Sequence, residues 1–229
     1  MDQRNHGFGG ATTAPYQSEA ASQLVKNKVL RNTYTLLTLN LAFAAVVAYL
    51  SLSQGWPYPG IIVFLAGAIG FPMIIGAFRN SAIGVALTFA FTGFLGYMLG
   101  PILGRYLAMA DGPMIVTTAF AGTAAIFAGL TMYAFTTKRD FSGLGPYIGI
   151  GLLTAFVLSI IGVMFNLGAL GLLMSGAFML LSSAAIVYQT QQIVNGGETN
   201  YIMATTTLFV SIFNIFVSLL QILGFASSD

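Results

Sequence analysis

Residues 182–224 read SSAAIVYQTQQIVNGGETNYIMATTTLFVSIFNIFVSLLQILG, and this stretch decides the fold. It predicts one membrane helix, a short polar turn and a second membrane helix with polar side chains on one face. These side chains, called the polar stripe below, recur at spacings of four, three, four and three: Thr207, Ser211, Asn214, Ser218 and Gln221. A repeat of about 3.5 residues aligns them along one side of a helix. Because hydrocarbon satisfies neither a hydroxyl nor an amide, the stripe must face other helices, which predicts a central position for the last helix.

The composition of the whole chain is that of an integral membrane protein. Of its 229 residues, 57% are hydrophobic and only 6% are charged, whereas soluble domains carry about 25% charged residues. The sequence contains no cysteine, which excludes disulfides, thiolate catalysis and cysteine metal sites.

Seven apolar runs reach about the 20 residues that a membrane helix requires. They cover approximately residues 33–53, 60–78, 81–103, 113–135, 144–165, 169–192 and 204–225. Residues 1–26 are polar and lack an apolar run, which predicts a disordered cytoplasmic tail in which His6, the only histidine, is inert. We therefore expect an all-α transmembrane domain over residues 27–229, with six helices packed around a central C-terminal helix.

The distribution of basic residues predicts the orientation. With the N-terminus in the cytoplasm, only Arg105 falls on the outer side, and seven basic residues fall on the inner side: Arg4, Lys26, Lys28, Arg31, Arg79, Lys138 and Arg139. The positive-inside rule favours this arrangement. After seven crossings the C-terminus lies on the outer side.

The residues that catalysis and metal binding use are missing from the apolar runs. These runs contain no histidine, and every acidic residue lies in a tail or a loop: Asp2, Glu19, Asp111, Asp140, Glu198 and Asp229. A histidine-based triad, a metal site and an intramembrane carboxylate pair are therefore not expected. We predict a protein without enzymatic activity, cofactor or nucleic-acid partner.

Two interpretations of the intramembrane polar residues stay open. Gln189, Ser211 and Asn214 either line a hydrated path for a cation or make hydrogen bonds between helices, and we favour the second. In the cytoplasmic turn, Gly196 and Gly197 indicate the end of a helix. Glu198 is expected to be solvated or to cap the helix that follows, and Asn200 belongs to the same turn.

Residues 196–224, GGETNYIMATTTLFVSIFNIFVSLLQILG, resemble the last segment of the Bax inhibitor-1 family. FAFTGFLGYMLGPIL (residues 89–103) and KVLRNTY (residues 28–34) resemble a bacterial branch of that family. The resemblance covers nearly all of the chain after the tail. It implies a seven-helix bundle with a central last helix, in the bacterial inner membrane with a periplasmic C-terminus.

The resemblance implies two functions. Members of the bacterial branch bind the membrane AAA protease FtsH, so we expect an inhibitor, and itself a substrate, of that protease in membrane protein quality control. Many other members are pH-sensitive calcium leaks with an aspartate in each of the last two helices. Gln189 and Ser211 stand at those positions here, and neutral oxygens bind calcium more weakly than paired carboxylates. A cation leak with neutral lining is the alternative, and a small-molecule transporter is a third possibility.

Overall fold

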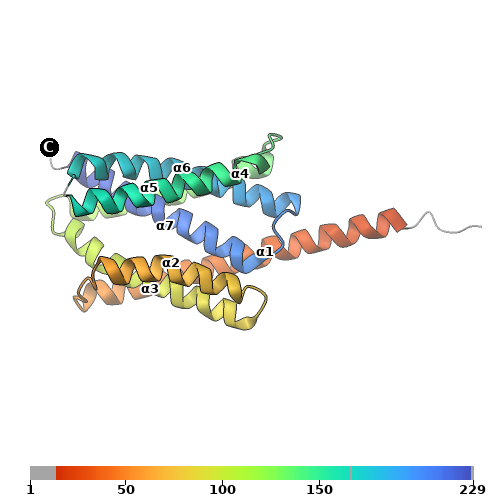
Figure 1. Cartoon of the computed structure of the whole chain (residues 1–229), viewed down its shortest axis with the longest axis horizontal. Coiled ribbons are helices and arrows are strands. Elements are labelled where there is room, and N and C mark those ends of the chain that lie inside the picture. Colours follow the sequence, from red (N-terminus) through yellow and green to blue (C-terminus); the bar gives the residue numbers. More distant parts are fainter. Residues whose placement is uncertain (1–13, 166, 228–229) are drawn as a thin grey trace, which may run out of the picture.

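The structure, a computed structural model, describes residues 14–165 and 167–227, and in these residues all regular structure is helical. His6 and most of the predicted tail lie outside them. The helices, labelled in Figure 1, are α1 (Ala14–Ser53), α2 (Ile61–Ala77), α3 (Ala82–Leu107), α4 (Gly112–Thr136), the short 3-10 helix η1 (Ser142–Leu144), α5 (Gly145–Met164), α6 (Gly168–Asn195) and α7 (Tyr201–Ala226).

The length and apolar composition of the helices confirm an all-α membrane protein. Within the described residues, six helices are long and apolar enough to cross a membrane: α1 from Gln23, α3, α4, α5 with η1, α6 from Leu170, and α7. Helix α2 has 17 residues, or about 26 Å at 1.5 Å per residue, somewhat less than the ~30 Å hydrocarbon core. Its ends therefore lie close to the two membrane surfaces if it spans.

Helix α1 departs from the prediction at its N-terminal end. The expected disorder is wrong for residues 14–26, because α1 begins at Ala14 and runs without a break into the first apolar run. Alanine, glutamine and glutamate are good helix formers, and Ala14, Gln17, Glu19, Ala20 and Ala21 lie in this segment. Adding residues to an existing helix avoids the cost of nucleation, so the membrane helix continues outward. Figure 1 shows this part of α1 projecting beyond the bundle.

The helices run up and down, so that alternate connections lie at the same end of the bundle. The α2–α3, α4–α5 and α6–α7 connections lie at the end from which α1 projects, and the C-terminus lies at the opposite end (Figure 1). Hydrogen bonds support this placement: Asn200 donates to the Arg79 carbonyl oxygen at 2.8 Å, and Gln191 donates to the Arg139 carbonyl oxygen at 2.8 Å. The basic residues of these connections are therefore gathered at one end, as the sequence predicts.

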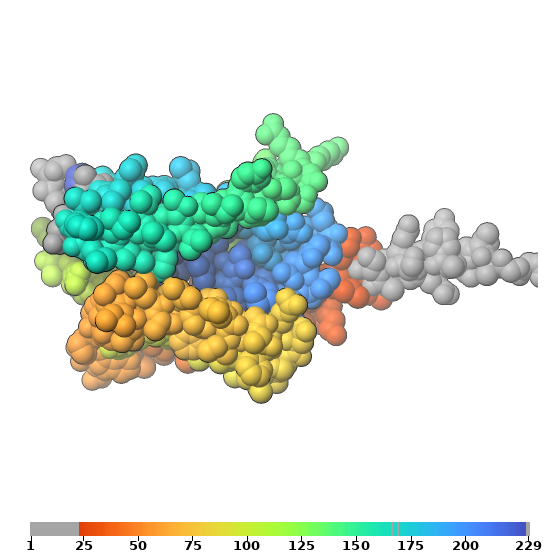
Figure 2. Space-filling model, viewed as in Figure 1, coloured from red at the N-terminus to blue at the C-terminus, as the bar shows by residue number. Residues whose placement is uncertain are grey.

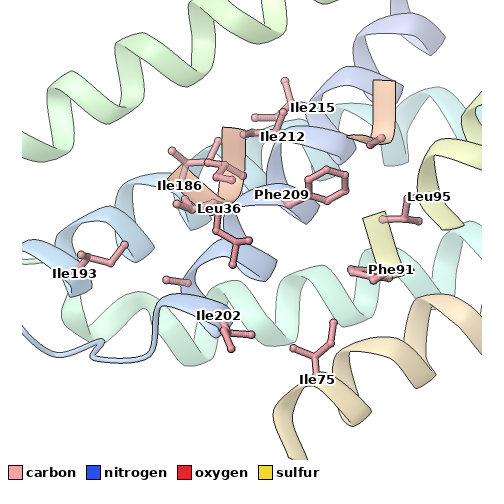
Figure 3. Close-up of a cluster of buried hydrophobic side chains, with 14 of the residues drawn as sticks. Leu36, Ile75, Phe91, Leu95, Ile186, Ile193, Ile202, Phe209, Ile212 and Ile215 are labelled. Atoms are coloured by element: carbon pink, nitrogen blue, oxygen red, sulfur yellow. The ribbon is translucent and has the colours of Figure 1, made fainter. Parts of the chain in front are cut away.

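Helix α7 is the central helix, with one exception to the predicted arrangement. It contacts α1, α2, α3, α4 and α6, and several of its large side chains are almost fully buried. Phe209, Ile212 and Ile215 of α7 meet Phe91 and Leu95 of α3 in the main apolar core, drawn in Figure 3. Helix α5 packs on α6 and makes no backbone approach to α7. The expectation that six helices surround α7 is thus wrong for α5.

The most extensive helix–helix contact joins α1 and α3. Gly96 faces the backbone of α1 so closely that a Cβ atom built on it would lie 2.5 Å from the Ala44 carbonyl oxygen. Asn40 of α1 is fully buried in the same contact; its amide donates to Thr88 Oγ1 at 3.2 Å, and its carbonyl oxygen accepts from Thr92 Oγ1 at 3.1 Å. Close backbone packing and a buried polar network therefore hold α1 against α3.

Candidate functional site

The polar stripe of α7 faces the interior of the bundle, although its members have different surroundings. Ser211 and Ser218 are buried, and Thr207, Asn214 and Gln221 are partly buried. Ser211 Oγ donates to the Thr207 carbonyl oxygen of its own helix at 2.9 Å. Of the five stripe members, only Gln221 makes a side-chain bond to another helix within the described residues, where it accepts from Ser175 Oγ of α6 at 2.5 Å. The stripe is therefore not a continuous set of interhelical hydrogen bonds.

A cavity of about 840 Å³ occupies the half of the bundle nearer the C-terminus. Residues of α2, α3, α5, α6 and α7 line it, and α7 contributes Asn214, Ser218 and Gln221 from the polar stripe. Figure 2 shows atoms of α7 between α2 and α5, at the bottom of a hollow. The lining is mainly apolar, with Phe91 of α3 and Phe213 of α7 among its aromatic members. We call this space the lateral cavity.

Three polar groups in the lateral cavity keep hydrogen-bonding capacity. Within the described residues, neither the Asn214 amide nor the Ser218 hydroxyl has a hydrogen-bond partner, although Ser218 is only 4% exposed. Gln221 uses its carbonyl oxygen to accept from Ser175 and retains its amide hydrogens. These groups face the cavity and can each donate a hydrogen bond to a molecule that enters it.

Gln189 and Ser211, which the resemblance places at two aspartate positions, do not line the lateral cavity. Gln189 is 6% exposed and Ser211 is 3% exposed, and the Gln189 amide nitrogen has no hydrogen-bond partner in the described part of the chain. Asn214 therefore belongs to a different environment from Gln189 and Ser211. The structure does not bring the three predicted pore residues into one cavity.

No cluster of three or more histidine, cysteine, aspartate or glutamate side chains that would hold a metal ion occurs in residues 14–165 and 167–227. Two acidic residues in this range, Asp140 of the α4–α5 connection and Glu198 of the α6–α7 connection, lie at the end from which α1 projects. Asp140 accepts from the backbone N–H of Ser142 at 2.8 Å, and this bond lowers the pKa of Asp140 below its ordinary value. Asp140 is therefore charged at neutral pH, beside Lys138 and Arg139.

The α6–α7 connection is a compact turn organised by Asn200. Helix α6 ends at Asn195 and is capped by Gly196, whose φ of +80° is the left-handed conformation that glycine adopts without strain. Asn200 caps α7 because its side-chain oxygen accepts from the backbone N–H groups of Ile202 and Met203 at 3.1 and 3.0 Å. Its amide also donates to Arg79 and Asn80 of the α2–α3 connection, each at 2.8 Å. Asn200 is thus both a helix cap and a link between two connections.

Glu198 takes a different part in this turn from the one expected. Its carboxylate accepts from the backbone N–H of Asn200 at 2.7 Å, so that it orients the capping residue, while Asn200 makes the cap itself. Gly197 lies against the Gln192 side chain, where a Cβ atom would collide with Gln192 Oε1. The four predicted turn residues therefore form one unit that closes the end of α6 and starts α7.

We expect Asn200→Ala to lower the free energy of unfolding by about 1–2 kcal/mol, because both the cap and the link are lost. Asn200→Asp separates the two roles. Aspartate still caps α7, but its second oxygen faces the carbonyl oxygens of Arg79 and Asn80 in place of the donating amide. Denaturant titration in micelles should therefore find the aspartate variant nearly as destabilised as the alanine variant. An aspartate variant as stable as the wild type would show that the cap alone matters.

Similar sequences place the chain in a family. Residues 26–228 match the family described as inhibitor of apoptosis-promoting Bax1. A protein of Escherichia coli K12 named modulator of FtsH protease YccA is 46% identical over 211 residues, which are 92% of this chain and 96% of that protein. An uncharacterized protein of Pseudomonas aeruginosa is 48% identical over 212 residues, 93% of this chain and 96% of that protein. The chain therefore belongs to the family of inhibitors of apoptosis-promoting Bax1, the Bax inhibitor-1 family that its last helix and its α3 segment resemble.

Proposed function

We propose that this protein modulates a membrane AAA protease of the FtsH type by direct binding in the bilayer, and that it is itself engaged by the protease. The observation that carries the proposal is the 46% identity, over nearly the full length of both chains, to a relative named for modulating FtsH. The proposal extends that relative's named role to this chain. The projecting end of α1 and the packing of the bundle support the mode of action.

Helix α1 provides a segment that a protease at the membrane surface can reach. Its 40 residues extend over about 60 Å, whereas the hydrocarbon core is only about 30 Å thick. The first buried apolar side chain described in α1 is Val29, and Leu24 and Val25 before it are 71% and 52% exposed. We propose that this projecting segment, with the residues before it, is the part that the protease captures.

The bundle provides the resistance that distinguishes an inhibitor from an ordinary substrate. Extraction by pulling on α1 has to break the α1–α3 contact, which includes the buried Asn40 network and the close approach at Gly96. It also has to separate α1 from α7, where Thr205 Oγ1 lies 3.2 Å from the Thr33 carbonyl oxygen. We propose that slow extraction keeps the protease occupied and protects other membrane proteins.

Deleting residues 1–23 tests the role of the projecting segment. We expect the shortened protein to be degraded severalfold more slowly than the full chain in cells that contain the protease, and at the same rate in cells that lack it. Pulse–chase measurement of both chains gives the comparison. A control chain in which residues 1–23 are replaced by a Gly/Ser-rich segment of equal length separates the effect of length from that of sequence. Unchanged turnover after the deletion would assign capture to another part of the protein.

A further inference from the structure

The lateral cavity opens sideways, toward the region that lipid occupies. No Cα atom of α2 lies within 8 Å of a Cα atom of α5, so these two helices leave a gap on the surface of the bundle. The residues at its edges are apolar and exposed: Ile69 of α2 is 52% exposed, and Leu153 and Val163 of α5 are 63% and 64% exposed. In a bilayer such side chains face hydrocarbon. The opening therefore connects the cavity with the acyl chains of the membrane.

The size of the cavity selects among the possible occupants. The cavity holds about 840 Å³. This falls in the range of about 300–1,000 Å³ that is common for small-ligand sites. A flexible hydrocarbon chain fits such a volume and is the commonest molecule at the opening.

The polar groups of the cavity match the polar part of a lipid chain. Asn214, Ser218 and Gln221 lie on one face of α7, and within the described residues the Asn214 amide, the Ser218 hydroxyl and the Gln221 amide nitrogen are without a side-chain or backbone acceptor. All three groups are hydrogen-bond donors, and the ester carbonyl of a phospholipid is an acceptor without a donor of its own. None of the described residues that line the cavity is charged, which disfavours a free fatty acid carboxylate.

We propose that the lateral cavity binds one acyl chain of a membrane phospholipid, which enters between α2 and α5. The chain lies against Phe178 of α6 and Phe213 of α7, and its ester carbonyl accepts hydrogen bonds from the stripe residues Ser218 and Gln221. The bound chain fills a space that would otherwise separate α5 from α7.

A photoactivatable phospholipid tests the proposal directly. The purified full chain is placed in vesicles of phosphatidylethanolamine and phosphatidylglycerol that contain a phospholipid with a diazirine in one acyl chain. After irradiation, mass spectrometry maps the labelled residues. We expect label on Phe178 and Phe213 inside the cavity, in addition to label on Leu173 and Leu180, which are 66% and 70% exposed on the surface of α6.

Filling the cavity provides the matched comparison. Ala68 of α2 lines the cavity, and Ala66 of the same helix is exposed outside it. We expect Ala68→Phe to reduce the labelling of Phe178 and Phe213 to about a tenth, equivalent to a tenfold loss of occupancy. We expect Ala66→Phe to leave it unchanged. Label on Leu173 and Leu180 should be the same in all three proteins, which controls for vesicle content and protein folding.

Three results would overturn the proposal. Label confined to Leu173 and Leu180 in the wild type would show that lipid does not enter the cavity, and this result needs no variant to fold. Equal labelling of Phe213 in the Ala68→Phe and wild-type proteins would show that the label reaches it by another route. A photo-crosslinking amino acid at position 213 that captures a protein in cell membranes, and no lipid, would assign the cavity to a partner protein.

Discussion

Replacing Gly96 by valine is expected to lower the free energy of unfolding by about 2–3 kcal/mol, within the range measured for overpacked interiors. A Cβ atom at this position lies 2.5 Å from the Ala44 carbonyl oxygen and 3.1 Å from the Ala44 Cα atom, both in the backbone of α1. A backbone cannot rotate aside as a side chain can, so α1 and α3 have to separate. Their contact is the most extensive in the bundle, and its other interactions weaken together.

Gly129→Val provides the control for the Gly96 variant. Gly129 lies in the middle of α4, and nothing approaches within 4 Å of a Cβ atom built there. We expect the unfolding midpoint of the Gly129→Val protein to stay close to that of the wild type when all three proteins are measured in one detergent. If both variants lost the same stability, the cause would be the low helix propensity of valine. The close approach of α1 and α3 at Gly96 would then not contribute to stability.

Replacing Asn40 by alanine is expected to have the next largest effect, a loss of about 1–3 kcal/mol in the free energy of unfolding. The substitution removes two hydrogen bonds, leaves the Thr92 hydroxyl without its interhelical partner and opens a cavity at a fully buried position. Asn27→Ala, on the exposed surface of the same helix, should change stability by less than about 0.5 kcal/mol.

A double-mutant cycle identifies the source of that effect. Thr92→Val removes one hydrogen bond of the network without emptying the site. If the Asn40–Thr92 bond contributes, the two substitutions together cost less than the sum of the separate losses, by about 0.5 kcal/mol or more. Strict additivity would show that the Asn40–Thr92 bond contributes nothing, and would leave the bond to Thr88 and the lost side-chain volume as the sources of the effect.

The apolar runs of the sequence predict where the helices lie because a bilayer imposes a minimum length on each of them. Helix α4 covers Gly112–Thr136 against an expected 113–135, and α7 covers Tyr201–Ala226 against an expected 204–225. The start of α1 was not predictable from hydropathy, because the segment from Ala14 to Lys26 is polar and helical at once. Its alanine-rich composition was the signal that indicated a helix.

The polar stripe shows what a pattern within one helix leaves open. Its spacing correctly predicts that Ser211 and Ser218 face inward, since both are buried. The spacing contains no information on what stands opposite. Ser218 and Asn214 face the lateral cavity because α5 packs on α6 and stays away from α7. That arrangement depends on contacts between segments far apart in the sequence.

Several polar residues that hold helices together lie outside the stripe. Asn40 is the one asparagine in the first apolar run, and an asparagine in such a run was a signal for an interhelical hydrogen bond. Thr205 makes the bond to α1, although it lies outside the spacing of four and three that defines the stripe. Gln191, which accepts from the Phe141 backbone at 3.2 Å and fixes the α4–α5 connection, had no distinguishing pattern among its polar neighbours.

Reconstitution of the full chain with purified FtsH-type protease in liposomes tests the central claim most directly. The rate at which the protease degrades a second membrane protein is measured with and without this chain, and calcium flux is recorded in parallel vesicles. If this chain acts by binding the protease, degradation of the second membrane protein slows as the amount of this chain increases. The chain and the protease then co-purify, and no calcium flux appears. Unchanged degradation together with a calcium flux that Ser211→Leu abolishes would contradict this account and establish an ion-conducting protein.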